Sequence, residues 1–291
     1  MRFSILTPSY NQAAFLERNI HSVLDQDVTE VEHIVMDGGS TGSTTEILKQ
    51  YGDKVRWVSE KDNGQADALN KALAMATGDL LGWLNVDEYY EPQIFAKISE
   101  VFRQNPDVVM VYGDFRRVTA SGEAIRINRQ WRFDFDVCQV QTVIVQNCAA
   151  FFRRDRVIEC GGFDASWHYV LDWELYLRLM RGNQKWVKLN QVLGNFTMHA
   201  LAKTSSAPEE FDREIQRLRR REFPKWTDEQ IEEHRLKQVR RMQMHMLMDG
   251  VLWEKIWFKL VRQAKYADVF GGAGVEVPVL SRFLRWISGV K

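Results

Sequence analysis

Segments with strand-like and helix-like patterns alternate along the first 112 residues, and this alternation limits the possible folds more than any other feature. Short apolar runs typical of strands occur at Phe3–Thr7, Glu32–Met36, Val55–Ser59, Leu80–Leu84 and Val108–Tyr112. Between them, apolar residues three and four positions apart predict helices at Ala13–Asp25, Thr44–Tyr51, Gln65–Ala76 and Pro92–Gln104. This spacing predicts an α/β fold with a mostly parallel, Rossmann-like sheet flanked by helices.

The strict alternation stops after Tyr112. The elements predicted beyond it are a hairpin of Phe115–Thr119 and Ala124–Asn128, a strand at Gln146–Phe152, and helices at Arg153–Glu159 and Asp172–Arg181. From Pro208 to about Lys265 the pattern is wholly helical. We therefore expect an α/β domain over residues 1–205, with halves 1–112 and 113–205, followed by a C-terminal helical extension over residues 206–291.

Composition narrows the class of protein. The chain is 45% hydrophobic and 27% charged, which is typical of a globular domain, and its formal net charge of zero argues against nucleic acid as the main partner. Three cysteines without a CxxC spacing indicate neither a disulfide framework nor a zinc site. Because the sequence shows no signal-like N-terminus and no long apolar run, we expect a cytoplasmic protein.

Polar residues follow four consecutive predicted strands, at the point where each strand ends. These residues are Pro8–Asn11, Asp37 with GGSTGST, Glu60–Gln65, and Asp87 with Glu88. In open parallel sheets the carboxyl ends of the strands meet at one edge, and ligands bind there. The sequence therefore predicts a binding site at this edge of the sheet.

The stretch LNVDEYYEP carries an apolar run directly into two adjacent carboxylates, Asp87 and Glu88. One interpretation is a solvated acidic turn, a common role for Asp and Pro. The other is a site for a divalent cation, because hard cations bind oxygen ligands and offset the repulsion between the carboxylates. The stretch by itself leaves both interpretations open.

Four segments in order carry a resemblance to a known family. ILTPSYNQAAFLERNIHSVLDQ, VMDGGSTGST, SEKDNGQADALNKAL and LNVDEYYEP resemble the nucleotide-sugar domain of family 2 glycosyltransferases, which have the GT-A fold, over roughly the first 200 residues. The resemblance implies an inverting transfer of a sugar from a nucleotide sugar, with a UDP-sugar favoured, to an acceptor hydroxyl. It also implies a role in bacterial surface polysaccharide or glycolipid assembly, with a glycan or lipid-linked glycan as the acceptor.

In this family the strand-end residues hold the nucleoside diphosphate. The positions that the resemblance places there are Pro8, Tyr10, Asn11, Asp37, Asp67, Lys71 and Asn85. Two have simpler alternatives: Asp37 is also a typical turn or helix-cap residue, and Lys71 is also a typical solvated helix charge. Gly42 departs from the family pattern DGGSTDGT, because it replaces the second Asp.

The resemblance also assigns the acidic pair. Asp87 matches the family residue that binds a divalent cation, Mn²⁺ or Mg²⁺, on the diphosphate, and Glu88 stands where the family more commonly has Asp. The segment TMHALAKTSS resembles the family's closing HxxxxKT-like stretch, which makes His199 a further metal or diphosphate ligand and Lys203 or Thr204 a phosphate contact. A structural role is the alternative for a lone histidine.

Asp172 in YVLDWELYLRL matches the family position of the catalytic base, with Leu171 replacing the usual Glu. A carboxylate suits this role because an acceptor hydroxyl is a poor nucleophile until a base takes its proton. The alternative makes Asp172 only the N-cap of an amphipathic helix. Trp167 and Trp173 have two interpretations as well, stacking on a sugar and core packing.

The C-terminal extension has two interpretations. Residues 251–265 and 279–291 combine Trp and basic residues on amphipathic helices, which is the composition of a peripheral membrane anchor. The alternative is a helical subdomain that packs on protein. Two rival functions also remain at this point: a nucleotidyltransferase of sugar activation, although TPSYNQ is no Gly-rich, basic phosphate loop, and a catalytically degenerate glycan-binding or scaffold protein.

Overall fold

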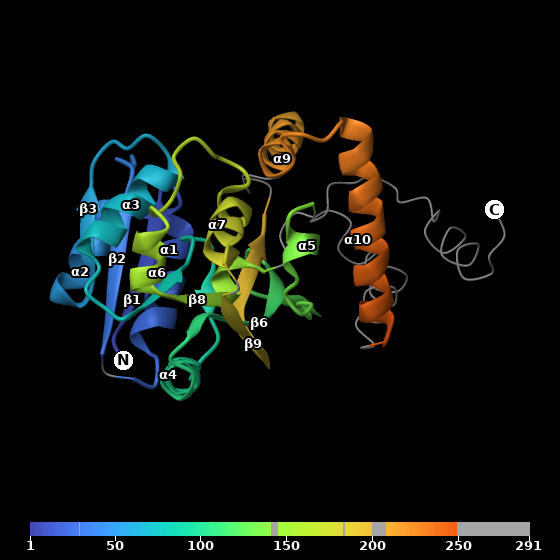
Figure 1. Cartoon of the computed structure of the whole chain (residues 1–291). Helices are drawn as coiled ribbons and strands as arrows, with labels where there is room; N and C mark the ends of the chain where they lie inside the picture. The colour runs from blue at the N-terminus through green and yellow to red at the C-terminus, as the bar shows by residue number, and fades with distance from the viewer. Residues whose placement is uncertain (29, 141–144, 183, 200–207, 249–291) are drawn as a thin grey trace.

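The computed structural model describes residues 1–28, 30–140, 145–182, 184–199 and 208–248 (Figure 1). The predicted phosphate contacts Lys203 and Thr204, and the amphipathic segments 251–265 and 279–291, lie outside these residues. Within them no helix is long and apolar enough to cross a membrane.

The first half of the chain forms the alternating strands and helices that the sequence predicts. Its elements are β1 (Phe3–Ser9), α1 (Ala13–Leu24), β2 (Val31–Asp37), α2 (Thr44–Gln50), the 3-10 helix η1 (Gly52–Lys54), β3 (Arg56–Ser59), α3 (Gln65–Met75), β4 (Leu80–Trp83), β5 (Tyr89–Tyr90) and α4 (Phe95–Gln104). β3, β2, β1 and β4 lie side by side in this order, and all three pairings are parallel. Their carboxyl ends therefore meet at one edge, as expected.

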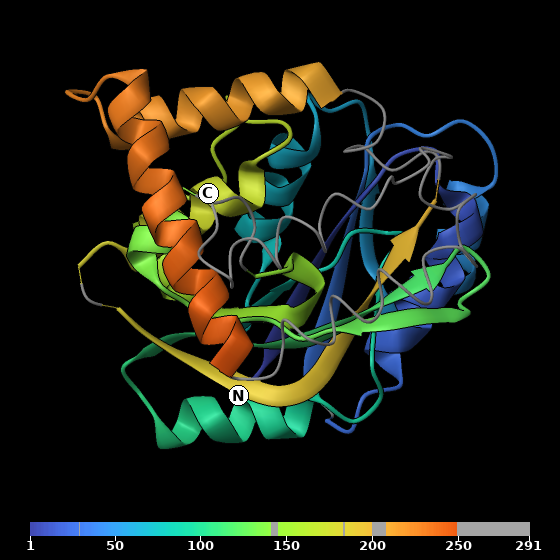
Figure 2. The same ribbon diagram turned by 90° about the vertical axis from the view of Figure 1, so that its right-hand side faces the viewer.

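The second half extends the sheet with strands of both directions. Its elements are β6 (Val108–Thr119), β7 (Ala124–Asn128), α5 (Phe135–Cys138), η2 (Asn147–Ala149), β8 (Ala150–Arg153), α6 (Arg154–Glu159), α7 (Leu171–Met180) and β9 (Lys185–Met198). β8 is antiparallel to both β4 and β6, whereas the long curved β9 runs parallel to β6 (Figure 2). The α/β fold with a sheet flanked by helices is thus confirmed.

Two predictions about this half were wrong, and one strand was missed. Val108–Tyr112 and Phe115–Thr119 belong to one continuous strand, β6, whose register against β9 shifts near Asp114. Residues 147–149 are a short 3-10 helix, so the strand predicted from residue 146 begins only at Ala150. β9 was not predicted, because much of its first half is half-exposed and lacks a clear alternation of apolar and polar residues.

Helices cover both faces of the sheet. Ile5 and Leu6 are neighbours in β1 and both fully buried, yet they belong to different hydrophobic cores, because successive strand residues point to opposite faces. The core around Leu6 includes residues of α3 and α7, and the core around Ile5 includes residues of α4. Both faces of the central strands are therefore buried against apolar side chains.

Two further helices, α9 (Pro208–Glu222) and α10 (Asp228–Met248), follow the sheet domain. Ile215 and Leu218 of α9 are buried in the same core as α7. α10 lies against α5 (Figure 1), where Arg241 forms an ion pair with Asp134. α9 is therefore packed on the α/β domain rather than separate from it.

Candidate functional site

The carboxylate of Asp37 is fixed where β2 ends. Ser9, Asp37 and Ser59 lie at matching positions of β1, β2 and β3, so their strands end side by side. Asp37 is 1% exposed, and its Oδ2 accepts hydrogen bonds from Ser59 Oγ at 2.6 Å and from Ser40 N at 2.9 Å. The turn role that was the alternative for Asp37 is therefore present. Contact of this fixed carboxylate with a nucleotide stays a prediction.

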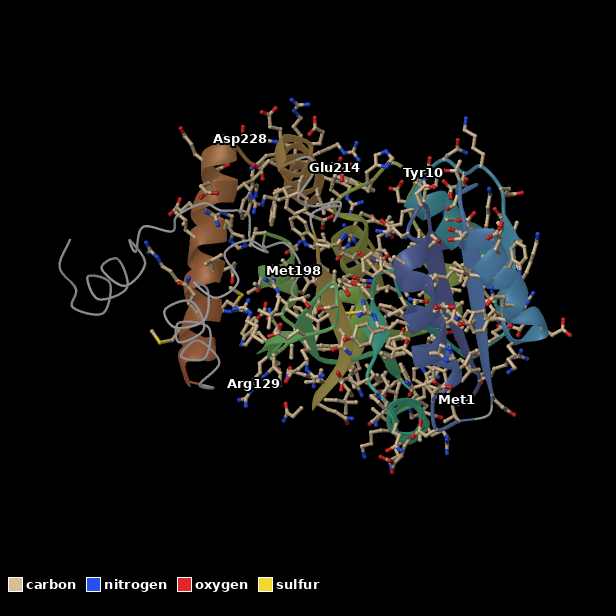
Figure 3. All side chains as sticks on the ribbon, turned by 180° about the vertical axis from the view of Figure 1, so that it is seen from behind. Met1, Tyr10, Arg129, Met198, Glu214 and Asp228 are labelled. Atoms are coloured by element: carbon tan, nitrogen blue, oxygen red, sulfur yellow. The ribbon has the colours of Figure 1, made fainter. Side chains whose placement is uncertain are left out.

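The loops after β1 and β2 are joined by hydrogen bonds. Asn11 has a φ of +53°, donates from its backbone N–H to Ser40 Oγ at 2.8 Å, and accepts at Oδ1 from Thr41 N at 3.0 Å. Pro8 lies within β1, beside Met36 of β2. Tyr10 is 63% exposed and lies toward the end of the molecule opposite Met1 (Figure 3). The chain thus presents Tyr10 to solvent on a braced loop, where a base or ribose could bind.

Gly42 lies in the second of these loops. Its φ is +102°, a conformation that side chains rarely adopt, and no atom lies within 4 Å of where a Cβ would be. The conformation is a sufficient reason for a glycine here in place of the family Asp.

Asp67 and Lys71 belong to α3 and form an ion-pair network with the end of β3. Lys71 Nζ lies 2.8 Å from Glu60 Oε1 and 3.4 Å from Asp67 Oδ2. The hydrogen bond from Asn63 N and the charge of Lys71 lower the pKa of Asp67, and the hydrogen bond to Glu60 raises the pKa of Lys71. Lys71 is therefore a paired charge beside the strand end, and nucleotide binding by this pair stays a prediction.

Residues 85–88 form a tight turn held by the protein interior. Glu88 N donates to Asn85 O at 2.9 Å, and Asn85 N donates in return to Glu88 Oε2 at 3.0 Å. Asn19 Nδ2, from the buried face of α1, donates to the carbonyl oxygens of both residues at 2.9 Å. The stretch is a turn, as one interpretation predicted, but Val86 and Glu88 are buried, so it is not a solvated one.

Glu88 points into the interior. It is 1% exposed, and Asn147 Nδ2 donates to its Oε2 at 2.7 Å, whereas its buried Oε1 has no hydrogen-bond partner among the described residues. Burial raises the pKa of Glu88 well above its usual range, and the charges of Asp87 and, to a smaller extent, Asp172 act in the same direction. A role of Glu88 as a metal ligand stays a prediction.

Asn85 is held through its side chain as well. Its Oδ1 accepts hydrogen bonds from Gln65 Nε2 at 2.7 Å and from Trp83 Nε1 at 2.9 Å. Gln65 is the first residue of α3, so this contact ties the acidic turn to the helix that follows β3. The amide that the resemblance assigns to nucleotide binding therefore lies at the junction of two strand ends.

Asp87 is partly exposed, unlike Glu88, and lies against His199, the residue that follows β9. Asp87 Oδ2 lies 2.8 Å from His199 Nε2, and the two side chains are 18% and 8% exposed. The ring of Phe15 lies 5.0 Å from the imidazole, which confines it on one side. The structure thus brings together two of the three predicted metal-site residues from far apart in the sequence.

This pair fits a divalent cation that is shared with a substrate. Among the described residues no group of three or more His, Cys, Asp or Glu side chains could hold a metal ion by itself. Mg²⁺ and similar cations are commonly held by one or two protein carboxylates together with substrate phosphates. Asp87 and His199 supply an oxygen and a nitrogen donor within 2.8 Å of one another, which is compatible with that arrangement.

Asp172 lies in the first turn of α7. Val170 is the N-cap, so the alternative that made Asp172 the N-cap was wrong; instead its Oδ1 accepts a hydrogen bond from Trp173 N at 2.7 Å. Val170 and Leu171, next to Asp172, are buried in the same hydrophobic core as Trp83, which ends the strand that leads into the acidic turn. The structure therefore places the predicted base on the same side of the sheet domain as the turn.

Trp167 and Trp173 pack in the core. They are 4% and 0% exposed, and Trp173 Nε1 donates to the carbonyl oxygen of Cys138. Buried indoles with a satisfied N–H are typical of core residues. The core-packing alternative is confirmed for both side chains.

Comparison with known proteins agrees with this geometry. The family model described as glycosyl transferase family 2 matches residues 4–162, which is more than half of the chain. The chain belongs to this family.

Relatives of this family 2 chain include polysaccharide synthases. A chondroitin synthase from Pasteurella multocida is 29% identical over 199 residues, which are 67% of this chain and 20% of that protein. An uncharacterised glycosyltransferase from Rickettsia prowazekii is 25% identical over 212 residues, 70% of this chain and 66% of that protein. The chain thus spans only about a fifth of the length of the first relative.

Solved structures share the fold. Staphylococcus aureus TarS 1-349 in complex with UDP-GlcNAc superposes with a TM-score of 0.63 at 18% identity, covering 84% of this chain and 73% of that one. The mannosyltransferase PcManGT from Pyrobaculum calidifontis, in complex with GDP-Man and Mn²⁺, gives 0.60 at 17% identity, covering 99% and 79%. These similarities establish the GT-A fold of this family 2 chain.

Several supporting residues of the site were missed by sequence reasoning. Ser40 and Ser59 fix Asp37, Asn147 fixes Glu88, and Asn19 fixes the acidic turn. Asn19 carried a usable signal, because it is a polar residue on the apolar stripe of α1 beside Leu16, Ile20 and Val23. Asn147 carried no such signal in the sequence, because its hydrogen-bond partner Glu88 lies 59 residues away.

Proposed function

We propose that this chain is an inverting glycosyltransferase that moves a sugar from a nucleotide diphosphate sugar to an acceptor hydroxyl. The observation that carries the proposal is the pairing of Asp87 with His199, at 2.8 Å, beside a turn that the interior holds rigidly. A partly exposed carboxylate on a rigid turn is suited to stabilise charge that develops on a leaving diphosphate. Membership of the family supports the same reaction class.

The donor binds at the strand-end edge in this proposal. Asp37 is held by serine hydroxyl and backbone donors and keeps accepting capacity for a base edge or ribose, while Tyr10 is exposed on the adjacent loop. Asn11, Asn85, Asp67 and Lys71 line the neighbouring loops and α3. We favour a UDP-sugar, in keeping with the UDP-GlcNAc held by TarS, and the GDP-Man held by PcManGT is the competing donor class.

A divalent cation, Mn²⁺ or Mg²⁺, would be held by Asp87 and His199, and by Glu88 if its side chain turns outward. When bound, such an ion supplies positive charge to the diphosphate. Asp87 and His199 would hold that charge at the edge where the diphosphate leaves. Oε1 of Glu88, which has no hydrogen-bond partner among the described residues, would be a further oxygen ligand.

The transfer step is assigned to Asp172. Its carboxylate takes the proton of the acceptor hydroxyl as the oxygen attacks the anomeric carbon, and the bond from that carbon to the diphosphate oxygen breaks. The nucleoside diphosphate leaves with the bonding electron pair, and the sugar is joined to the acceptor with inverted configuration. Observation of a retained configuration in the product would contradict this step.

The acceptor class is a growing glycan. Chondroitin and hyaluronan synthases among the relatives support a role in bacterial surface polysaccharide or glycolipid assembly, with a glycan or lipid-linked glycan as acceptor. We place the protein in the cytoplasm, in peripheral contact with the inner membrane through residues 251–291. A protein that neither binds anionic liposomes nor changes its cellular distribution when these residues are deleted would contradict that placement.

The experiment that tests the proposed function is a transfer assay on the full chain with UDP- and GDP-sugars, Mn²⁺ and a panel of oligosaccharide acceptors. We expect the wild type to release a nucleoside diphosphate and Asp172→Asn and Asp87→Asn to lose most of this activity. The matched control Asp53→Asn, whose carboxylate is exposed on η1, should keep the wild-type activity. Release of pyrophosphate instead would indicate a nucleotidyltransferase. Absence of turnover with every donor would favour the scaffold function.

A further inference from the structure

The helix that carries Asp172 is held at its N-terminus by a residue from outside the sheet domain. Glu214 of α9 accepts hydrogen bonds from the backbone N–H groups of His168 at 2.9 Å, Tyr169 at 2.7 Å and Val170 at 3.2 Å. These three residues lead directly into α7, which begins at Leu171. One carboxylate therefore binds all three residues that lead into the helix.

The N-terminus of α7 is held from outside the helix and not by the side chain of its own N-cap residue. The N-cap residue is Val170, whose side chain cannot accept a hydrogen bond, and no side-chain cap is present. The first N–H groups of a helix have no partner within the helix, and a negative charge at this end is favourable to the helix dipole. Glu214 does not bind these first N–H groups; it binds those of residues 168–170, just before them, and so brings a negative charge to this end of the helix from 44 residues away in the sequence.

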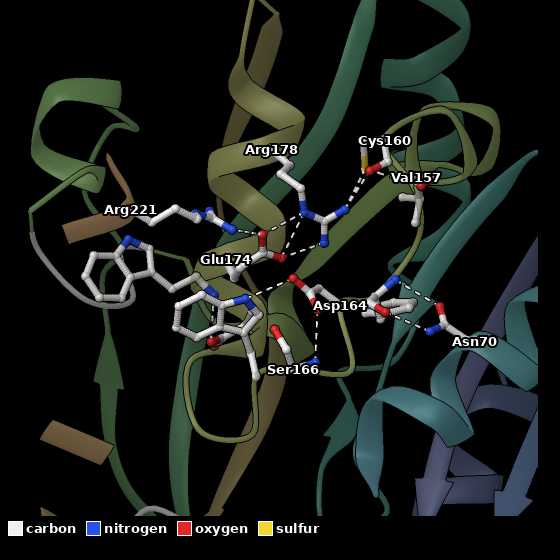
Figure 4. Close-up of polar contacts among 12 residues, drawn as sticks. Asn70, Val157, Cys160, Asp164, Ser166, Glu174, Arg178 and Arg221 are labelled. Atoms are coloured by element: carbon white, nitrogen blue, oxygen red, sulfur yellow. Dashed lines mark hydrogen bonds and ion pairs between the residues drawn. The ribbon is translucent and has the colours of Figure 1, made fainter. Parts of the chain in front are cut away.

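A second contact fixes the same helix one turn further on. Glu174 is 0% exposed, and Arg178 Nε donates to its two carboxylate oxygens at 2.8 and 2.9 Å. Arg221 of α9 donates to the same carboxylate (Figure 4). Because a buried charge is costly without partners, this pairing holds α9 and α7 in one relative position.

Apolar contacts complete the junction between α9 and the α7 approach. The guanidinium of Arg217 lies 3.7 Å from the ring centroid of Trp167, just before the residues that Glu214 binds. Ile215 and Leu218 lie in the core that includes α7. α9 therefore contacts the start, the first full turn and the preceding loop of the helix with Asp172.

We propose that Glu214 is a positioning residue for Asp172: by fixing residues 168–170, it sets the orientation in which the carboxylate of Asp172 meets the acceptor hydroxyl. The inference rests on the proposed function, in which Asp172 is the base. Displacement of a catalytic group by about 1 Å can cost about 100-fold in rate, so a residue that fixes a helix start can act on turnover without touching substrate. The C-terminal extension is in this sense part of the catalytic apparatus.

The test compares Glu214→Ala, the conservative Glu214→Gln and the matched control Glu209→Ala, whose carboxylate is 81% exposed on the same helix. We expect Glu214→Ala to lower kcat by about 10- to 100-fold, with UDP affinity and acceptor KM within about two-fold of the wild type. Glu214→Gln should recover most of kcat, because its amide oxygen still accepts from the same N–H groups. The control should match the wild type.

A double-mutant cycle separates positioning from general destabilisation. If Glu214 acts through Asp172, adding Glu214→Ala to Asp172→Asn should lower the residual kcat by less than about two-fold. Additive losses, a Glu214→Ala kcat equal to that of the wild type, or a loss in Glu214→Gln as large as in Glu214→Ala would each overturn the inference. Should Glu214→Ala not fold, Glu214→Asp, whose shorter side chain cannot hold residues 168–170 in the same position, takes its place in the cycle with the same expected and contradicting outcomes.

The same data distinguish this inference from the proposed function. An active wild type in which Asp172→Asn is silent would overturn the assignment of the base, and this inference with it. An active wild type with a strong Asp172→Asn defect and a silent Glu214→Ala would overturn the positioning role alone.

Discussion

The strand-end edge, built around Asp37 and the 85–88 turn, and the helix corner, where α9 meets α7, are held in different ways. At the edge, Asp37 is fixed by residues 3 and 22 positions away, and each strand delivers its own polar loop. At the corner, α7 is fixed by Glu214 and Arg221, which are 44 to 47 residues away and belong to another helix. Around Asp37 the edge is thus specified locally, and the 85–88 turn is held by Asn19 and Asn147 from within the sheet domain. The corner, in contrast, exists only after α9 has docked.

This contrast suggests a division of labour. A donor site made of consecutive strand ends forms with the sheet itself, so it should tolerate changes at the corner. A base on a helix that is held from outside should be sensitive to those changes. The following experiments test this division, in order of decreasing expected effect.

The largest effect is expected from Asp172→Asn. Loss of a general base should lower kcat by about 10²- to 10⁴-fold, while UDP affinity stays at the wild-type value because the strand-end edge is intact. Steady-state kinetics with calorimetric titration of UDP checks both. A comparable loss of UDP affinity would show that the two regions are not separable.

The next largest effect is expected from Asp87→Asn. Removing the charge that stabilises the leaving diphosphate should lower kcat by about 10²- to 10³-fold and abolish the dependence of rate on Mn²⁺. Rates measured across a manganese titration test this, with Asp53→Asn as the charge-matched control. A variant that keeps the wild-type manganese response would remove Asp87 from the metal site.

A buried histidine beneath the strand-end edge, His33, should make the free energy of unfolding depend on pH. His33 in β2 is 1% exposed beside Thr7 Oγ1 at 2.9 Å, and burial lowers its pKa to about 3. Because the unfolded chain takes up this proton near pH 6.5, stability is full above that value and falls as the pH drops toward 3. At pH 5 the loss amounts to about 2 kcal/mol.

Urea unfolding of the wild type and His33→Gln at pH 7 and pH 5 isolates this loss, because the opposite contribution of Glu88, whose pKa is raised, is common to both proteins. His33→Gln should remove most of it, whereas His21→Gln, at an exposed helix position, should leave it unchanged. Glu32 does not interfere in this window: its serine, backbone and arginine hydrogen bonds outweigh burial and lower its pKa to about 2, so its own contribution is lost only below about pH 4.5. An equal pH dependence in His33→Gln would contradict the assignment.

The smallest effect is expected from Ser59→Ala. Ser59 Oγ donates to Asp37 Oδ2 at 2.6 Å, and loss of one such hydrogen bond is worth about 1 kcal/mol. UDP affinity should therefore fall about five-fold, with kcat at saturating donor unchanged. A fall in kcat with unchanged affinity would place Asp37 in the transfer step rather than in donor binding.

The same contrast explains what the sequence could predict. The strands β1 to β4 and their loops follow from local patterns, and the family motifs lie on those loops, so Asp37, Asn85 and Asp87 could be placed at one edge in advance. The pairing of Asp87 with His199 spans 112 residues and depends on β9, which has no clear alternation in its first half. Only the family motif pointed to His199.

The corner was beyond prediction for a physical reason. Glu214 lies on a helix with many charges, where a carboxylate has the same appearance whether it faces water or caps another helix. Whether Asp172 is an N-cap depends on a two-residue difference in the start of α7, which local propensity does not resolve. The charge network of Glu174, Arg178 and Arg221 likewise becomes visible only once the helices are packed.

The most direct test of the proposed function is calorimetric titration of the wild type and Asp87→Ala with UDP and with GDP, each with and without Mn²⁺. We predict that one nucleotide, expected to be UDP, binds in a manganese-dependent way to the wild type, and that this dependence is lost in Asp87→Ala. Failure of both nucleotides to bind the wild type, or equal manganese dependence in the two proteins, would contradict a nucleotide-sugar site built around Asp87.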